Sequence, residues 1–255
     1  MESYKMMATV YDELIREDVN YESIAEYILG LCNKFNISFS SYLDLACGTC
    51  NVGSYIGKKF KENYFVDLSS DMLIEADKKL RECRIKGKIV CQDMSDLNLN
   101  KTFDLINCVL YSTNYVLDEN DLTNYFRGVY NHLNDDGLFV FDINSYYKIS
   151  EILGNNIYSY NSDDIFYVWE NIFEDEIVEM NLSFFIKQQN GLYKRFDEVH
   201  EERGYKDEFI EEILRKIGFN FVEKFDGYSN LKATNKSERI TYIVRKSEEF
   251  LWVIK

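Results

Sequence analysis

An apolar run that opens into a loop of small residues constrains the fold of this chain more than any other feature. Residues 42–46 read Tyr-Leu-Asp-Leu-Ala and lead into Cys-Gly-Thr-Cys, and a second apolar run, residues 63–66, ends in Asp67. Small residues let the backbone of such a loop approach a ligand closely. In α/β folds an acid at the tip of the next strand, roughly 20 positions further on, binds ribose hydroxyls. The pattern predicts an adenosine-containing cofactor, with Gly48 at the close approach and Asp67 on the ribose.

From residue 42 onward, apolar strand-like runs alternate with amphipathic helical patterns, which indicates a parallel sheet covered on both faces. Strands are expected over residues 42–46, 64–67, 88–91, 103–110, 138–143, 219–225 and 239–245. Helices are expected over residues 21–35, 53–60, 70–84, 119–133 and 209–217. The predicted fold is therefore α/β, with a doubly wound, mostly parallel, seven-stranded Rossmann-like sheet.

Residues 165–205 break this alternation. Three long strands are expected over residues 165–174, 177–188 and 192–205, and the Asn190-Gly191 pair between the last two is a hairpin signal. We expect an antiparallel β insertion that acts as a lid, with Trp169 and Phe184 in its own core. The predicted segments are residues 1–148, with N-terminal helices and a cofactor-binding core, the insertion 149–205, and residues 206–255, which complete the core sheet.

The charge balance limits the expected partners. The chain has 44 acidic and 29 basic residues and a net charge of −15, which disfavours binding to nucleic acid and to anionic membranes. No run reaches the roughly 18 apolar residues that span a bilayer, and the N-terminal residues lack the apolar core of a signal peptide. A cytoplasmic protein that binds neither nucleic acid nor membrane is expected, and monomer and homodimer both stay open.

Two of the six cysteines, Cys47 and Cys50, form a Cys-x-x-Cys pair within the loop. A zinc or redox site would need a second cysteine pair or histidines close by. The two histidines, His132 and His200, lie far away in the sequence. No metal site is therefore predicted, and the thiols are expected to be reduced.

Five short motifs follow one another along the first half of the chain. They are Asp44-Leu45-Ala46-Cys47-Gly48-Thr49, Val66-Asp67-Leu68-Ser69, Gln92-Asp93-Met94, Phe103-Asp104-Leu105-Ile106 and Leu133-Asn134-Asp135-Asp136-Gly137-Leu138. In this order and spacing the chain resembles the class I S-adenosylmethionine (SAM)-dependent methyltransferases, in particular the small-molecule branch with a β-rich insertion before the last two strands. The resemblance implies an enzyme that transfers a methyl group from SAM to a nitrogen or oxygen of a small metabolite by direct in-line displacement.

The same resemblance implies the cofactor contacts. Asp44 and the loop through Gly48 would hold the methionine part of SAM, and Asp67 would bind the ribose hydroxyls. Met72 would pack on the adenine, while Asp93 and the Met94 amide would bind its edge. The remaining cofactor contacts implied by the motifs are Tyr11, Ala46, Leu68, Gln92 and Cys108.

Some of these residues have other interpretations. Asp93 could cap a short turn near Ser95, and Asp67 could cap the next helix, although Ser69 is better placed to do so. The loop also departs from the family pattern, because the outer two of its three usual glycines are Ala46 and Cys50. A cysteine side chain at that position could crowd the cofactor or change the turn.

Substrate contacts are expected from the carboxyl ends of the later strands and from the insertion. Tyr11 resembles an aromatic residue with which the family covers its cofactor, and an aromatic face also suits a sulfonium cation. Period-two alternation puts His200 and Glu202 on one face, where either could take a proton, with His200 preferred. Cross-strand charge pairing on a solvated sheet face is the alternative. The candidate catalytic residues are His200 and Tyr11, and the candidate substrate-binding residues are Tyr111, Asn114, Tyr115, Asp142, Asn144, Glu202 and Arg203.

Two other classes of function stay open. An NAD(P)-dependent oxidoreductase would also use a ribose-binding acid, but its fingerprint needs Gly-x-Gly-x-x-Gly, and this loop offers only Gly48 and Gly53. A non-catalytic protein could bind the adenosyl cofactor and act through a partner, with the insertion as its interface. An exposed apolar patch on the insertion would favour that alternative, and a concave pocket beside the cofactor would oppose it.

Overall fold

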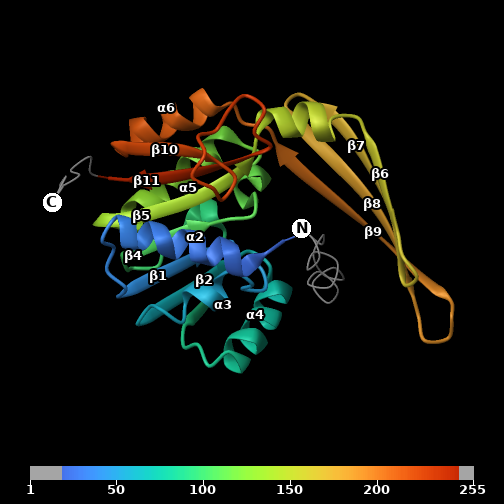
Figure 1. Cartoon of the computed structure of the whole chain (residues 1–255), viewed down its shortest axis with the longest axis horizontal. Coiled ribbons are helices and arrows are strands. Elements are labelled where there is room, and N and C mark those ends of the chain that lie inside the picture. Colours follow the sequence, from blue (N-terminus) through green and yellow to red (C-terminus); the bar gives the residue numbers. More distant parts are fainter. Residues whose placement is uncertain (1–18, 247–255) are drawn as a thin grey trace.

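A seven-stranded sheet forms the centre of the molecule. The computed structural model describes residues 19–246, and its central strands lie in the order β10-β11-β5-β4-β1-β2-β3 (Figure 1). Strand β11 is antiparallel to both of its neighbours, and the other pairs are parallel. The strands are β1 (Ser41–Leu45), β2 (Glu62–Asp67), β3 (Lys88–Cys91), β4 (Phe103–Cys108), β5 (Leu133–Asn144), β10 (Phe221–Asp226) and β11 (Arg239–Arg245). The predicted doubly wound, mostly parallel sheet is confirmed.

Local sequence signals fix where the helices begin and end. The Ser69 side chain accepts a hydrogen bond from the Met72 amide at the start of α4, and Gly218, at φ 119°, ends α6. None of the helices in residues 19–246 is long and apolar enough to cross a membrane. The α-helices are α2 (Tyr21–Lys34), α3 (Gly53–Ile56), α4 (Ser70–Glu82), α5 (Glu119–His132) and α6 (Asp207–Ile217), with 3₁₀ turns η2 (Met94–Asp96) and η3 (Ser112–Tyr115) and the π-helix η4 (Lys148–Leu153).

Hydrophobic cores on both faces of the sheet follow from the period-two geometry of its strands. Along β1, Leu43 and Leu45 belong to the core that includes α5 and α6, whereas Tyr42 belongs to the core that includes α2. Strand β5 divides in the same way, with Phe139 in the first core and Val140 in the second. Because hydrophobic cores cover both faces of the sheet, the carboxyl ends of its parallel strands remain free to form a site.

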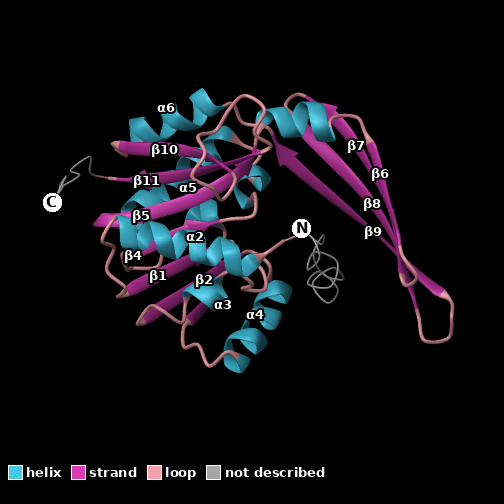
Figure 2. Ribbon diagram, in the orientation of Figure 1, coloured by secondary structure: helices cyan, strands magenta, loops and turns pink. Residues whose placement is uncertain are grey.

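A second, antiparallel sheet of four strands follows β5 and projects beside the core as a long arm (Figures 1 and 2). The predicted strands are present, and the sequence analysis missed a short one, β6, which precedes them. The arm strands are β6 (Ile157–Asn161), β7 (Ile165–Glu174), β8 (Ile177–Lys187) and β9 (Tyr193–Arg203). The base of the arm packs on the core, where Asn114 Nδ2 donates to the backbone oxygens of Asn144 and Arg203 at 3.0 and 2.9 Å.

Candidate active site

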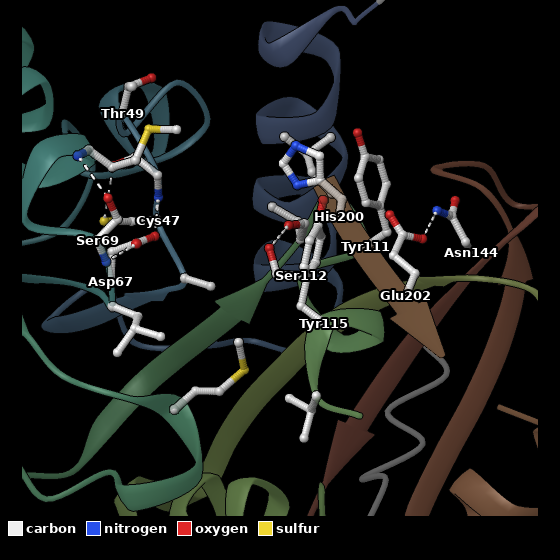
Figure 3. Close-up of a pocket in the computed structure, with 18 of the residues that line it drawn as sticks. Cys47, Thr49, Asp67, Ser69, Tyr111, Ser112, Tyr115, Asn144, His200 and Glu202 are labelled. Atoms are coloured by element: carbon white, nitrogen blue, oxygen red, sulfur yellow. Dashed lines mark hydrogen bonds between the residues drawn. The ribbon is translucent and has the colours of Figure 1, made fainter. Parts of the chain in front are cut away.

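A cavity of about 1100 Å³ lies between the carboxyl ends of the central strands and the inner face of the arm. Figure 3 shows two groups of lining residues, with Cys47, Thr49, Asp67 and Ser69 on one side and Tyr111, Tyr115, His200 and Glu202 on the other. Among the residues proposed from the sequence, the cavity brings together Asp44, Ala46, Gly48, Asp67, Leu68, Met72, Gln92, Asp93, Met94, Tyr111, Tyr115, Asn144, His200 and Glu202. The cofactor candidates and the substrate candidates therefore share one cavity.

The loop after β1 has a left-handed backbone at alternate positions. Ala46, Gly48 and Cys50 have φ values of 55°, 53° and 61°. These are the three positions that carry glycine in the resembling family, so the turn keeps its shape although alanine and cysteine occupy its ends. Strained non-glycine backbone of this kind clusters at functional sites. Within residues 19–246, and apart from its chain neighbours, no atom lies within 4 Å of the position that a Cβ at Gly48 would take, so the loop presents bare backbone to the cavity.

Asp67 ends β2 and links that strand to the loop. Its Oδ2 accepts the Gly48 amide and its Oδ1 accepts the Ser69 amide, each at 2.8 Å. Burial raises the pKa of this carboxyl, and the backbone hydrogen bonds act in the opposite direction. Each carboxylate oxygen has two lone pairs, so both oxygens keep capacity to accept a hydroxyl. Because Ser69 caps α4, Asp67 is not needed for that role.

Asp44 is a buried acid beneath the same loop. Its Oδ1 accepts a 2.7 Å hydrogen bond from Asn107 Nδ2, and burial raises its pKa to about 7. Its Oδ2 lies 2.2 Å from the position that a Cβ at residue 53 would take. Gly53 is therefore required where α3 begins, for reasons of space.

The adenine-side candidates lie around the ends of β2 and β3. Met72 is 4% exposed and lines the cavity from α4, together with Leu68, Gln92 and Met94. Asp93 lines the cavity and also caps η2, since its Oδ1 accepts from both the amide and the hydroxyl of Ser95 at 2.8 Å. Both interpretations of Asp93 therefore apply at once, because its second oxygen makes no hydrogen bond within residues 19–246.

The Cys47 and Cys50 thiols belong to the loop and are protonated. Burial raises the pKa of both, which opposes the thiolate that redox chemistry and metal binding require. Within the described part of the chain no group of histidine, cysteine and carboxylate side chains is arranged to hold a metal ion.

Strands β5 and β9 and the loop after β4 supply the opposite side of the cavity. Leu110 and Tyr111 are consecutive left-handed residues, at φ 62° and 55°, and the Tyr111 amide donates to Asp142 Oδ1 at 3.2 Å. The Tyr115 and His200 rings meet edge to face at 6.1 Å. Asn144 Nδ2 donates a 2.7 Å hydrogen bond to Glu202 Oε2 (Figure 3).

The two titratable residues of β9 have opposite acid–base properties. His200 is 6% exposed, and burial lowers its pKa to about 4, so the ring is neutral and weakly basic at pH 7. Glu202 is 2% exposed, and burial raises its pKa to about 7. A group whose pKa lies near the working pH is the better general base. These pKa values thus favour Glu202 over His200 as a proton acceptor, and both residues line the cavity.

Four sequence candidates lie outside the cavity lining. Cys108 is buried in the core beside Thr113, and Asn114 fastens the base of the arm. Asp142 supports the Tyr111 loop, and Arg203 donates to Leu117 O and pairs with Glu119 and Glu176. These four residues position their neighbours in this structure. The fifth, Tyr11, lies outside the described residues.

Sequence analysis missed several lining residues. Trp169 packs against the hydrophobic cluster of the insertion that contains Val178 and Met180, as expected, and it also lines the cavity. Phe184 is 3% exposed and lines the cavity as well. Lys148 and Arg239 also line it. The position of Lys148 just after β5 was a usable signal, whereas Arg239 enters only through the antiparallel pairing of β11 with β5.

Comparisons with known proteins agree with this geometry. Residues 43–137 match a family model described as a methyltransferase domain. The chain is 32% identical over 250 residues to YqeM of Bacillus subtilis (strain 168), named as a methyltransferase, and the match covers 96% of this chain and 98% of YqeM. The crystal structure of an S-adenosylmethionine-dependent methyltransferase from Clostridium acetobutylicum ATCC 824 is 50% identical, with a TM-score of 0.90 over 95% of this chain and 98% of that chain.

More distant structures share the fold. Streptomyces venezuelae DesVI is 21% identical and gives a TM-score of 0.81 over 94% of this chain and 98% of that chain. Together with the closer relatives this defines an enzyme of the class I methyltransferase fold. The chain belongs to the SAM-dependent methyltransferases, and SAM is its cofactor.

Proposed function

We propose that this enzyme transfers the methyl group of SAM to a nitrogen or oxygen of a small metabolite by direct in-line displacement. The observation that carries the proposal is the shared cavity, in which the loop at Gly48 and the Glu202 carboxylate line the same space. A concave pocket beside the cofactor loop also opposes a non-catalytic role through a partner.

We assign the cofactor contacts as follows. The bare backbone at Gly48 and the buried acid Asp44 hold the methionine part of SAM, and Asp67 accepts the ribose hydroxyls. Met72 packs on the adenine, since a thioether suits an aromatic ring, and the second oxygen of Asp93 accepts from the exocyclic amine. The bent loop, kept in shape by Ala46 and Cys50 at positive φ, supports this assignment.

The chain's own residues orient the acceptor and remove its proton. When bound, SAM supplies a methyl carbon already activated by a cationic sulfur, so the protein needs no covalent nucleophile. Alignment and water exclusion contribute several kcal/mol, up to about 7–11 in favourable cases. Tyr111 and Tyr115 shape the space around the acceptor. Glu202, held through Oε2 by Asn144, takes the proton.

Relatives support a small acceptor. The chain is 28% identical over 134 residues to a Streptomyces venezuelae dTDP-3-amino-3,4,6-trideoxy-alpha-D-glucopyranose N,N-dimethyltransferase, although the match covers only 52% of this chain. A sugar N-methyltransferase, KedS8, has a similar fold at 20% identity. These names favour nitrogen acceptors over oxygen. The insertion, residues 149–205, serves as the substrate lid in this proposal.

Matched amine and alcohol acceptors test the proposed function. The full chain is incubated with SAM labelled in its methyl group, and label is followed into pairs of small molecules that differ only in an amino or a hydroxyl group. Label in either partner of a pair, together with release of S-adenosylhomocysteine, is expected. Binding of SAM with transfer only to a protein or nucleic acid would overturn the small-metabolite assignment.

A further inference from the structure

On the inner face of the arm, β9 contributes a polar residue to each of the three rows nearest the core, and the fourth row is aromatic. Register in the arm sheet aligns residues from neighbouring strands in rows, two residues apart along each strand. From the core outward the rows are Val178 with Glu202, Met180 with His200, Trp169 with Leu182 and Glu198, and Tyr167 with Phe184 and Phe196. Residues Tyr167, Trp169, Leu182 and Phe184 line the cavity from the outer rows. An acid therefore lies at one end of an aromatic wall.

Glu202 has one carboxylate oxygen to offer. Asn144 occupies Oε2, and Oε1 makes no hydrogen bond within residues 19–246. The side chain is 2% exposed yet lines the cavity. Because the side chain lines the cavity, Oε1 can accept a hydrogen bond from a ligand there.

The charged residues that line the cavity determine whether a cationic or an anionic ligand is favoured. The acids that line it are Asp44, Asp67, Asp71, Asp93, Asp118, Asp121 and Glu202, against the bases Lys148 and Arg239. Arg239 is already paired, with its Nε 3.3 Å from Asp142 Oδ2. Asp44, Asp67 and Asp93 belong to the proposed SAM contacts, and Lys148 acts on Glu202 through its charge. The rest of the wall still has more acids than bases, with Asp71, Asp118, Asp121 and Glu202 against Lys148 and Arg239, so an ammonium is favoured over a phosphate.

Resting on the proposed function, we infer that the acceptor is a phosphate-free amine joined to an apolar, ring-bearing body. Its ammonium lies at Glu202 and its ring on the row of Trp169 and Leu182. Glu198 marks that row on β9, four residues from Glu202, which is about 14 Å along a strand. This separation favours a spacer of several methylenes between nitrogen and ring.

In the proposed methyl transfer, reactants and products contain the same atoms and carry the same total charge. Glu202 takes one proton from the ammonium, and the freed nitrogen lone pair forms the new bond to the methyl carbon as the carbon–sulfur bond breaks. The products are a methylated ammonium, a neutral thioether and a protonated Glu202, which returns its proton to solvent.

A homologous amine series tests the inference. The full chain is saturated with S-adenosylhomocysteine and titrated calorimetrically with phenylalkylamines from 2-phenylethylamine to 6-phenylhexylamine, with 6-phenylhexan-1-ol, and with thymidine diphosphate. We expect 6-phenylhexylamine to bind at least about tenfold more tightly than 2-phenylethylamine or the alcohol. Thymidine diphosphate should give no heat of binding at matched concentrations.

Three variants assign the contacts. Glu202→Gln should weaken amine binding by about tenfold or more while alcohol binding is kept, which also shows that the site is folded. Trp169→Ala should abolish the increase in affinity that a longer alkyl spacer gives the amine. Glu201→Gln, on the opposite and exposed face of β9, is the matched control and should bind like the unaltered chain.

The outcomes separate the inference from the function on which it rests. Tighter binding of thymidine diphosphate than of any amine, or amine affinity unchanged by Glu202→Gln, would overturn the amine inference. If label from SAM then reaches a phosphorylated metabolite, methyl transfer to a small molecule stands without it. Failure of the chain to bind S-adenosylhomocysteine would remove both.

Discussion

The backbone amide of Gly48 donates a 2.8 Å hydrogen bond to Oδ2 of Asp67. This bond joins the turn after β1 to the tip of β2, two parts of the chain that run side by side in the sheet. In the proposed cofactor site, the acid assigned to the ribose therefore also fixes the loop assigned to the methionine part of SAM. A change at either residue is then expected to act on both contacts.

Asp67→Asn should weaken binding of S-adenosylhomocysteine by roughly 10- to 100-fold, because charged hydrogen bonds contribute about 1.5–3 kcal/mol. Titration calorimetry measures the change. Asp77→Asn is the control, since Asp77 forms an exposed ion pair with Arg81 on α4 and does not line the cavity in the described part of the chain. Equal affinities for the two variants would contradict the ribose role of Asp67.

Gly48→Ala should cost about 1 kcal/mol of unfolding free energy, because alanine is strained in the left-handed region. Gly191→Ala should cost a similar amount, since Gly191 has φ 80° and equally open surroundings in the distant β8–β9 hairpin. Cofactor binding should fall only in Gly48→Ala, where the new methyl group enters the cavity. Loss of affinity in both variants would show that it comes from general destabilisation.

Gly53→Ala should destabilise the fold by roughly 1–3 kcal/mol, because the new Cβ would lie 2.2 Å from Asp44 Oδ2. Gly30→Ala should stabilise it by about 0.5–1 kcal/mol, since Gly30 lies within α2 and no other atom of residues 19–246 outside the nearby helix backbone is within 4 Å of its Cβ position. Urea unfolding of the two variants measures the contrast. Similar midpoints would contradict the packing around Asp44.

Glu202 should make the fold less stable as pH rises. Burial raises its pKa from its ordinary value of 4.5 to about 7, so between these values the native state holds a proton that the unfolded chain has lost. This contribution to stability is fully present below pH 4.5 and is lost as pH rises through 7, by at most about 3 kcal/mol. The titratable and charged groups that face Glu202 are His200, Lys148, Arg239, Asp142 and Tyr111.

Comparison with Glu202→Gln isolates this effect, because the neighbouring groups are common to both proteins. Urea unfolding between pH 5 and pH 8 should show the unaltered chain losing stability relative to the variant as pH increases. Curves that stay parallel across this range would show that Glu202 does not titrate with a raised pKa.

Local pattern was sufficient for the central sheet. Apolar runs followed by Gly48 and Asp67 marked the first two strands, and the later strands of the core were found within two residues of their observed bounds, except β5, which begins five residues before its expected start. The short β6 was missed because its residues are all exposed, so no apolar alternation marks it.

The cavity was harder to predict, for a physical reason. Period-two alternation divides a strand into two faces but does not say what lies opposite either of them. Trp169 and Phe184 therefore gave the same signal as core residues. The pKa of His200 depends on burial by distant parts of the chain, so sequence spacing alone could not reveal how weak a base it is.

In the proposed function the arm provides the wall for the acceptor, whereas the central sheet provides the loop and acids for SAM. Asn114 and Asn144 join the two parts where β9 reaches the sheet edge. Replacing the outer arm strands with those of a relative should consequently change which acceptor is methylated and leave the affinity for SAM unchanged. Specificity and cofactor use can thus diverge independently in this architecture.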